Sequence, residues 1–115
     1  MRVPEMNART GPPLRDTLPG FAREVEQRLR EAGREDLAGQ VTRLRITDRC
    51  RCGDDFCASL YTEASPAGGW RQRHETVPIG ARQGLINVDA MMGRIVAIEV
   101  LFRPEVRRAL EHIVP

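Results

Sequence analysis

The sequence predicts a single α+β domain, in which an antiparallel sheet of four or five strands in meander order is flanked by an N-terminal and a C-terminal helix. Three observations favour this fold class. Helical periodicity is confined to the two ends of the chain, strand-like segments fill residues 41–101 between them, and turn residues separate those segments. The sequence indicates no regular alternation of helix and strand, which a parallel βαβ fold would require.

The first part of the chain is predicted to contain a tail and a helix. Residues 1–16 are rich in proline and show no hydrophobic period, so we expect a mobile tail there and one domain over residues 17–115. The helix is predicted between Thr17, whose hydroxyl can cap it, and Gly33, which can end it. Apolar residues between these positions fall at helical spacing. The second helix is predicted at the other end of the chain, where Pro104 can occupy its first turn.

Strands are predicted over residues 41–47, 56–62, 74–79, 85–89 and 94–101. In the first of them, Leu44 and Ile46 alternate with arginines, which is the pattern of a half-buried strand. The last is apolar on both faces except at Glu99, which favours a central position in the sheet. Gly93 supplies the turn that precedes it.

Residues 84–101 resemble the terminal hairpin of small uncharacterised bacterial proteins, which are domains of unknown function. Those hairpins combine an Asp-ended strand, a glycine-containing turn and the sequence Arg-Ile-Val-x-Ile-Glu-Val-Leu. Asp89, Gly93, Arg94 and Glu99 match this pattern. The resemblance implies a small sheet and brings no activity with it.

Composition excludes several classes of protein. Hydrophobic residues make up 41% and charged residues 30% of the chain, which is typical of a soluble globular domain. No apolar run approaches the ~20 residues of a membrane-spanning helix, and the N-terminus lacks the apolar stretch of a signal peptide, so we expect a cytoplasmic protein without a membrane partner. The net charge is only +2, with 18 arginines interleaved among 16 acidic residues, so nucleic-acid binding is not expected.

The three cysteines form the most unusual local feature, because Cys50, Cys52 and Cys57 lie within one short segment. Side chains alternate along a strand, so Cys50 and Cys52 are expected on the same face. The position of Cys57 depends on the register of the hairpin. If Cys52 pairs with Cys57, all three sulfurs share one face, whereas pairing of Cys52 with Phe56 turns Cys57 away.

Several roles fit this segment. Three thiolates could bind zinc, with His74 or an Asp from the turn as the fourth ligand. Cys52 and Cys57 could form a disulfide or redox pair, and Cys57 could act as a nucleophile with His74 as its base. We favour a structural interpretation, in which the cysteines are small buried hydrophobic side chains.

The predicted function is non-enzymatic. The sequence contains no phosphate loop and no motif that joins a nucleophile to a base, so we assign no catalytic residue and no cofactor, zinc in the alternative role excepted. We expect protein–protein association, with a homodimer as one form of it. Trp70, Arg43 and Arg45 are the predicted interaction residues. The alternative is a zinc- or thiol-based redox module that uses Cys50, Cys52 and Cys57.

Overall fold

Two amphipathic helices form where their apolar periods predict them. In the computed structural model, which describes residues 11–64 and 74–115, α3 spans Pro19–Glu31 and α5 spans Pro104–Ile113. Each has a proline in its first turn, where no N–H is needed. The remaining helical elements are short: α2 (Leu14–Thr17), α4 (Glu35–Ala38) and the 3₁₀ turn η1 (Val41–Arg43).

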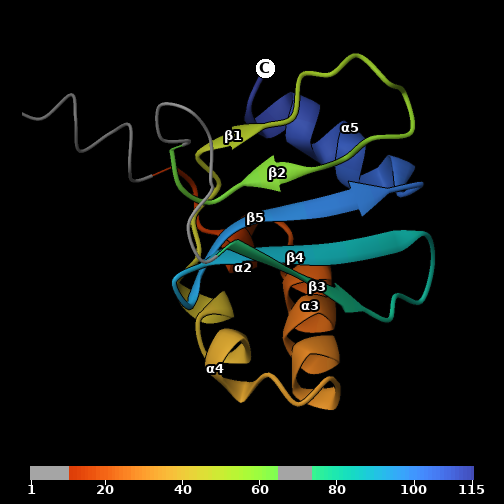
Figure 1. Ribbon diagram of the computed structural model, residues 1–115. Coiled ribbons are helices and arrows are strands. Elements are labelled where there is room, and N and C mark those ends of the chain that lie inside the picture. Colours follow the sequence, from red (N-terminus) through yellow and green to blue (C-terminus); the bar gives the residue numbers. More distant parts are fainter. Residues whose placement is uncertain (1–10, 65–73) are drawn as a thin grey trace, which may run out of the picture.

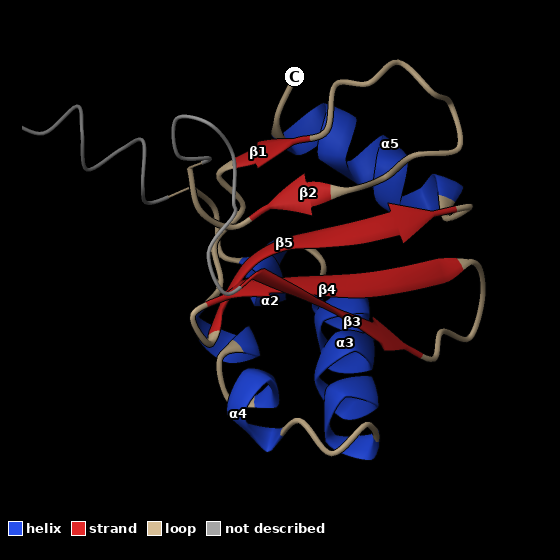
Figure 2. Ribbon diagram, in the orientation of Figure 1, coloured by secondary structure: helices blue, strands red, loops and turns tan. Residues whose placement is uncertain are grey.

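The sheet has five antiparallel strands in the order β1-β2-β5-β4-β3 (Figure 2). Their bounds are β1 (Asp48–Arg49), β2 (Leu60–Tyr61), β3 (His74–Ile79), β4 (Leu85–Met91) and β5 (Arg94–Leu101). The α+β class is confirmed, but the predicted meander order is wrong because β2 pairs with β5 rather than with β3. The central strand is β5, as its apolar composition predicts.

The helices cover one face of the sheet. Figure 1 shows α2, α3 and α5 on the same side of the strands. Apolar side chains of these helices and of the strands meet in one core. Val25 of α3, Val106 of α5 and Ile98 of β5 are all buried in it. No helix of the described residues lies on the opposite face, which we call the open face.

The segment predicted as the first strand differs from the prediction. Leu44 and Ile46 are buried as their alternation predicts, but residues 41–43 form η1 and no sheet strand begins before Asp48. The backbone of this segment pairs with the chain near the N-terminus instead, since the Leu14 N–H donates to the Leu44 carbonyl at 2.9 Å. That neighbour is too short to extend the sheet.

The predicted tail also ends earlier than expected. Residues 1–10 lie outside the described part of the chain, but Leu14 is fully buried and belongs to α2. The predicted strand over 56–62 is shortened to β2, although Cys57 still forms a bridge with Leu101 in the same register. Residues 65–73, between the predicted strands at 56–62 and 74–79, lie outside the described residues.

Gly84 holds the loop before β4 close to the end of β5. Its φ is +74°, and a Cβ built on it would lie 2.3 Å from the Leu101 carbonyl oxygen. We therefore expect Gly84→Ala to lower the free energy of unfolding by about 2–4 kcal/mol, because strain and a backbone clash add together. Gly93 has a φ of +80° but open space around it, so Gly93→Ala should lose only about 1–2 kcal/mol. Urea unfolding of both variants tests this, and equal losses would contradict the role of the clash.

A buried ion-pair network ties α3 to α5. The Arg103 side chain is 1% exposed, and its Nη2 donates to Glu24 Oε1 at 2.9 Å while its Nε donates to Glu105 Oε2 at 2.7 Å. Arg103 Nη1 also donates to the Gln83 carbonyl at 3.2 Å. One guanidinium therefore connects two helices and the loop between β3 and β4.

Candidate metal centre

The register of the strands arranges the side chains of the open face in rows. Tyr61 on β2 lies opposite Ala97 on β5, which in turn lies opposite Asp89 on β4. In the neighbouring row Asn87 lies opposite Glu99, and Asn87 Nδ2 donates to Glu99 Oε1 at 2.8 Å. Acidic groups therefore occupy the middle of this face.

The three cysteines converge at one end of the open face. β1 and β2 pair with Arg49 opposite Leu60, and this register, continued toward the turn, places Cys52 opposite Cys57. The Sγ atoms of Cys50, Cys52 and Cys57 all lie within 4.8 Å of one another. Of the two registers considered from the sequence, the structure has the one that brings the three thiols together.

These thiols are not core side chains. Cys52 is exposed, and Cys50 and Cys57 are half-buried, so the structural interpretation of three buried hydrophobic residues is wrong. The disposition follows from the hairpin itself. Cys50 donates its N–H to the Ser59 carbonyl at 2.9 Å, which directs its side chain to the same side of the pair as the side chain of Ser59.

The local environment makes the thiols unequal. Burial raises the pKa of the Cys50 thiol to about 11. Burial also acts against ionisation of Cys57, but hydrogen bonding with the hydroxyl and the backbone of Ser59 outweighs it and lowers the pKa of Cys57. Cys57 Sγ lies 3.4 Å from Ser59 Oγ, and that hydroxyl also accepts the Val100 N–H at 2.9 Å. Cys57 therefore ionises at a lower pH than Cys50, and a nearby positive charge would favour the Cys50 thiolate.

A cavity of about 470 Å³ opens beside the cluster. Cys52 Sγ lies 3.8 Å from Asp54 Oδ2, so this carboxylate from the turn borders the thiols directly. The other polar side chains of the lining are Ser59, Tyr61, Asp89 and Glu99, and the apolar ones are Phe56, Leu60, Ala97, Ile98 and Leu101. Thiols, carboxylates and apolar groups thus share one concave surface.

His74 does not lie with the thiols. It is on β3, at the edge of the sheet opposite to β1, and its Nε2 is 3.3 Å from Asp89 Oδ1. Three interstrand spacings separate β2 from β3, or about 14 Å. The structure therefore supports neither His74 as the fourth ligand nor the pairing of Cys57 with a histidine base.

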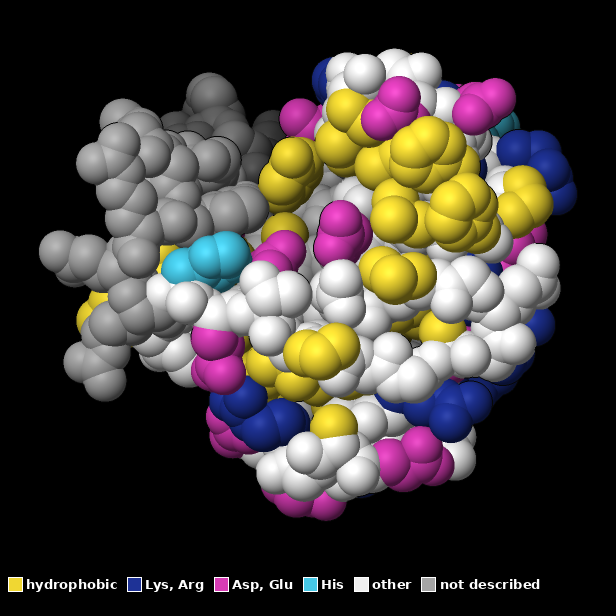
Figure 3. Space-filling view, turned by 45° about the vertical axis from the view of Figure 1, so that its right-hand side comes forward, with side chains coloured by type: hydrophobic (Ala, Val, Ile, Leu, Met, Phe, Trp, Pro, Cys, Tyr) yellow, Lys and Arg dark blue, Asp and Glu magenta, His cyan; other side chains and the backbone are white. Residues whose placement is uncertain are grey.

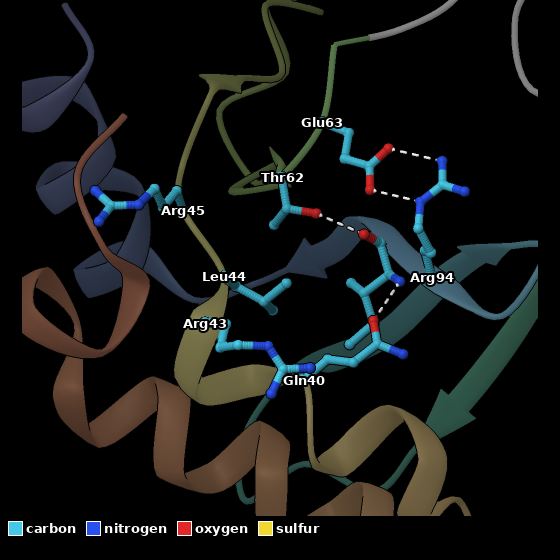
Figure 4. A pocket seen from close by; sticks show the side chains of 8 residues that line it. Gln40, Arg43, Leu44, Arg45, Thr62, Glu63 and Arg94 are labelled. Atoms are coloured by element: carbon cyan, nitrogen blue, oxygen red, sulfur yellow. Dashed lines mark hydrogen bonds and ion pairs between the residues drawn. The ribbon is translucent and has the colours of Figure 1, made fainter. Parts of the chain in front are cut away.

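The predicted interaction residues do not form one surface. Trp70 lies outside the described residues. Arg43 and Arg45 line a separate cavity of about 400 Å³, and Figure 4 shows their side chains directed away from one another on either side of Leu44. Arg43 and Arg45 do not share the face of a strand, as their alternation with Leu44 would require, because residues 41–43 form η1. The same cavity holds a paired arginine, since Arg94 donates to both carboxylate oxygens of Glu63 at 3.0 Å.

Sequence reasoning missed the residues that complete the cavity. Tyr61, Asp89 and Glu99 reach it from three different strands, so no local motif contains all three. The one available signal was the polar alternation within the apolar sequence of β4 and β5, where Asp89 and Glu99 interrupt the hydrophobic residues. Such residues meet only if their strands are neighbours in the sheet. The predicted meander placed β5 beside β4 alone, so it did not bring Tyr61 of β2 next to β5.

Comparison with known proteins assigns nothing to this chain: no family model, no curated protein and no solved structure matches it. The likeness of residues 84–101 to a bacterial hairpin therefore stays a prediction. No helix in residues 11–64 and 74–115 is long and apolar enough to cross a membrane. What the site can do follows from its geometry and chemistry.

Proposed function

We propose that Cys50, Cys52 and Cys57 bind a thiophilic metal ion, with Zn²⁺ as the preferred ion. The observation that carries this proposal is the convergence of three Sγ atoms within 4.8 Å of one another. Thiolates bound to a tetrahedral zinc at about 2.3 Å lie about 3.8 Å from each other. The three sulfurs therefore need to approach one another by about 1 Å at most, which rotation of the exposed Cys52 side chain can supply.

The surroundings of the cluster support a bound cation. Asp54 is our candidate for the fourth ligand, because its Oδ2 lies 3.8 Å from Cys52 Sγ, although it would have to move closer to the other two sulfurs. A metal ion would also supply the positive charge that the Cys50 thiolate lacks. Serine and backbone groups orient Cys57 from behind, in the way that outer partners orient metal ligands.

Metal titration tests the proposal. The 115-residue chain, reduced and freed of metal, is titrated with Co²⁺ and then with Zn²⁺. We expect one Co²⁺ per chain, with the sulfur-to-cobalt charge-transfer absorption and the visible bands of a tetrahedral site, and complete displacement by one equivalent of Zn²⁺. Absence of these bands, together with substoichiometric zinc in freshly purified protein, would overturn the proposal.

Two further outcomes are distinguishable in the same samples. Tight binding of Cu⁺ with weak binding of Zn²⁺ would overturn the choice of ion, since three soft thiolates also suit Cu⁺. A thiol assay that finds one free cysteine in air-exposed, metal-free protein would show that two of the three cysteines form a disulfide, and peptide mapping that places it between Cys52 and Cys57 would favour the redox alternative. The metal proposal requires all the cysteines to titrate as free thiols after chelation.

A further inference from the structure

Among the described residues, the acidic groups that line the cavity of the open face form no ion pair with an arginine, unlike most other acidic groups. Within residues 11–64 and 74–115, every carboxylate outside one small set forms an ion pair with an arginine of the same part of the chain. The exceptions are Asp54, Asp55, Asp89 and Glu99. Three of these line the cavity of the open face, and Asp55 lines the hollow next to it. Three of the four carboxylates that have no arginine partner within these residues therefore line the open face, where His74 contacts Asp89.

Apolar side chains gather beside this charge. Phe56, Leu85 and Phe102 are 42%, 41% and 57% exposed. The rings of Phe56 and Phe102 stack with centroids 5.3 Å apart, and Leu85 lies opposite Leu101 at the same end of the sheet. Figure 3 shows hydrophobic side chains concentrated on the upper part of this face, acidic side chains next to them and basic side chains toward the margin. A contiguous apolar patch rimmed by charge is typical of an interaction site.

Phe102 occupies its exposed position at a conformational cost. Its φ is +62°, in the left-handed region that aromatic residues rarely adopt. Its N–H donates to the Phe56 carbonyl at 2.8 Å, so the backbone holds the two rings together at the surface. Strain of this kind costs about 1–3 kcal/mol and is most common at functional sites.

We infer that the open face binds an extended segment of another protein that carries an apolar side chain followed by arginine or lysine at alternate positions. Along β5, Leu101, Glu99 and Ala97 point to this face at intervals of about 7 Å, and Asp89 lies opposite Ala97. An extended peptide has the same repeat between every second side chain. Such a peptide would place its apolar residue near the phenylalanine pair and its cationic residues over Glu99 and Asp89.

A second copy of this chain is a poorer occupant. A symmetric dimer through the open face would bring the carboxylates of both copies together, and like charges oppose such contact. A head-to-tail contact with the arginines around Arg43 and Arg45 would be heterologous, and would give a ring or an open chain of molecules rather than a two-fold dimer. A segment of a different protein that carries both apolar and cationic side chains complements the apolar patch and the carboxylates together.

Fluorescence anisotropy with a labelled synthetic peptide tests this inference. The probe is a nine-residue peptide with leucine, arginine and arginine at alternate positions and serine between them, added to the full chain in chelator and reducing agent so that metal does not contribute. We expect the Asp89→Asn/Glu99→Gln double variant to bind it at least ten-fold more weakly than the unmodified protein. Both substitutions keep the side-chain hydrogen bonds to Thr76 and Asn87, so the sheet should be preserved.

A matched control removes two carboxylates from the opposite layer. The Glu26→Gln/Glu31→Gln variant alters partly exposed acidic residues of α3 and should leave peptide affinity unchanged within two-fold. Equal weakening by both double variants, or equal affinity for a peptide with glutamate in place of arginine, would overturn the inference. Self-association in sedimentation velocity that Asp89→Asn/Glu99→Gln abolishes would identify a second copy as the occupant and overturn it as well.

Discussion

Replacing Arg103 with alanine is expected to lower the free energy of unfolding by about 3–5 kcal/mol. The substitution leaves the Glu24 side chain, 9% exposed, without the guanidinium that donates to it at 2.9 Å. It also removes the contact of that guanidinium with the Phe21 ring, whose centroid lies 5.8 Å away. Urea unfolding at pH 7, followed by far-ultraviolet circular dichroism, measures the loss.

An exposed ion pair provides the control. Arg94 and Glu63 also form a two-bond pair, but their side chains are 52% and 37% exposed. Arg94→Ala should therefore cost less than about 1 kcal/mol. The double variant Glu24→Met/Arg103→Met should recover much of the stability lost by Arg103→Ala, because apolar residues can replace a buried pair. Similar losses for Arg103→Ala and Arg94→Ala would contradict the importance of burial.

The Glu24–Arg103 pair predicts how the free energy of unfolding depends on pH. Burial alone would raise the pKa of Glu24, but its hydrogen bonds and charge interactions with Arg103 and Arg82 lower it. The folded pKa lies below that of the unfolded chain, so this contribution is complete above about pH 4.3 and is lost as the pH falls through the folded value. Wild-type protein should therefore lose stability more steeply in that acidic range than Glu24→Gln, as measured by urea unfolding at a series of pH values.

Replacing Cys57 with serine is expected to weaken Zn²⁺ binding by about 100-fold or more, because a zinc site with four ligands has about 10–16 kcal/mol of binding free energy to share among them. The loss should be of similar size for Cys50→Ser, whose Sγ belongs to the same cluster. Affinity is measured by competition with a chromophoric chelator at fixed pH. Binding should also weaken as the pH falls, because protons compete for the thiolates and the free Cys50 thiol has a pKa of about 11.

Two control variants locate the site. His74→Ala should leave zinc affinity unchanged, because His74 contacts Asp89 at the far edge of the sheet. Asp54→Asn should weaken binding if the turn carboxylate supplies the fourth ligand, while the three thiolates keep the ion bound. If His74→Ala lost as much zinc affinity as Cys57→Ser, His74 would be a ligand of the ion. That result would contradict the geometry described above.

Local patterns predicted the bounds of several elements. The bounds of β3 and β5 agree with the predicted strands at 74–79 and 94–101, and α5 begins at Pro104 as expected. The first strand failed for a physical reason. Alternation of Leu44 and Ile46 reports which side chains are buried, but a strand also needs a neighbouring strand, and residues 44–46 pair with residues 12–14 instead.

The sequence by itself determined the α+β class, the burial of the apolar faces and the presence of three thiols in one turn, because each depends on composition and on short-range periodicity. Only the tertiary structure decided that β2 pairs with β5, that the register turns Cys50, Cys52 and Cys57 toward one another, and that Asp89 and Glu99 share their cavity. These outcomes depend on contacts between segments far apart in the chain. A shift of one residue in register would turn a side chain to the other face without any change in sequence.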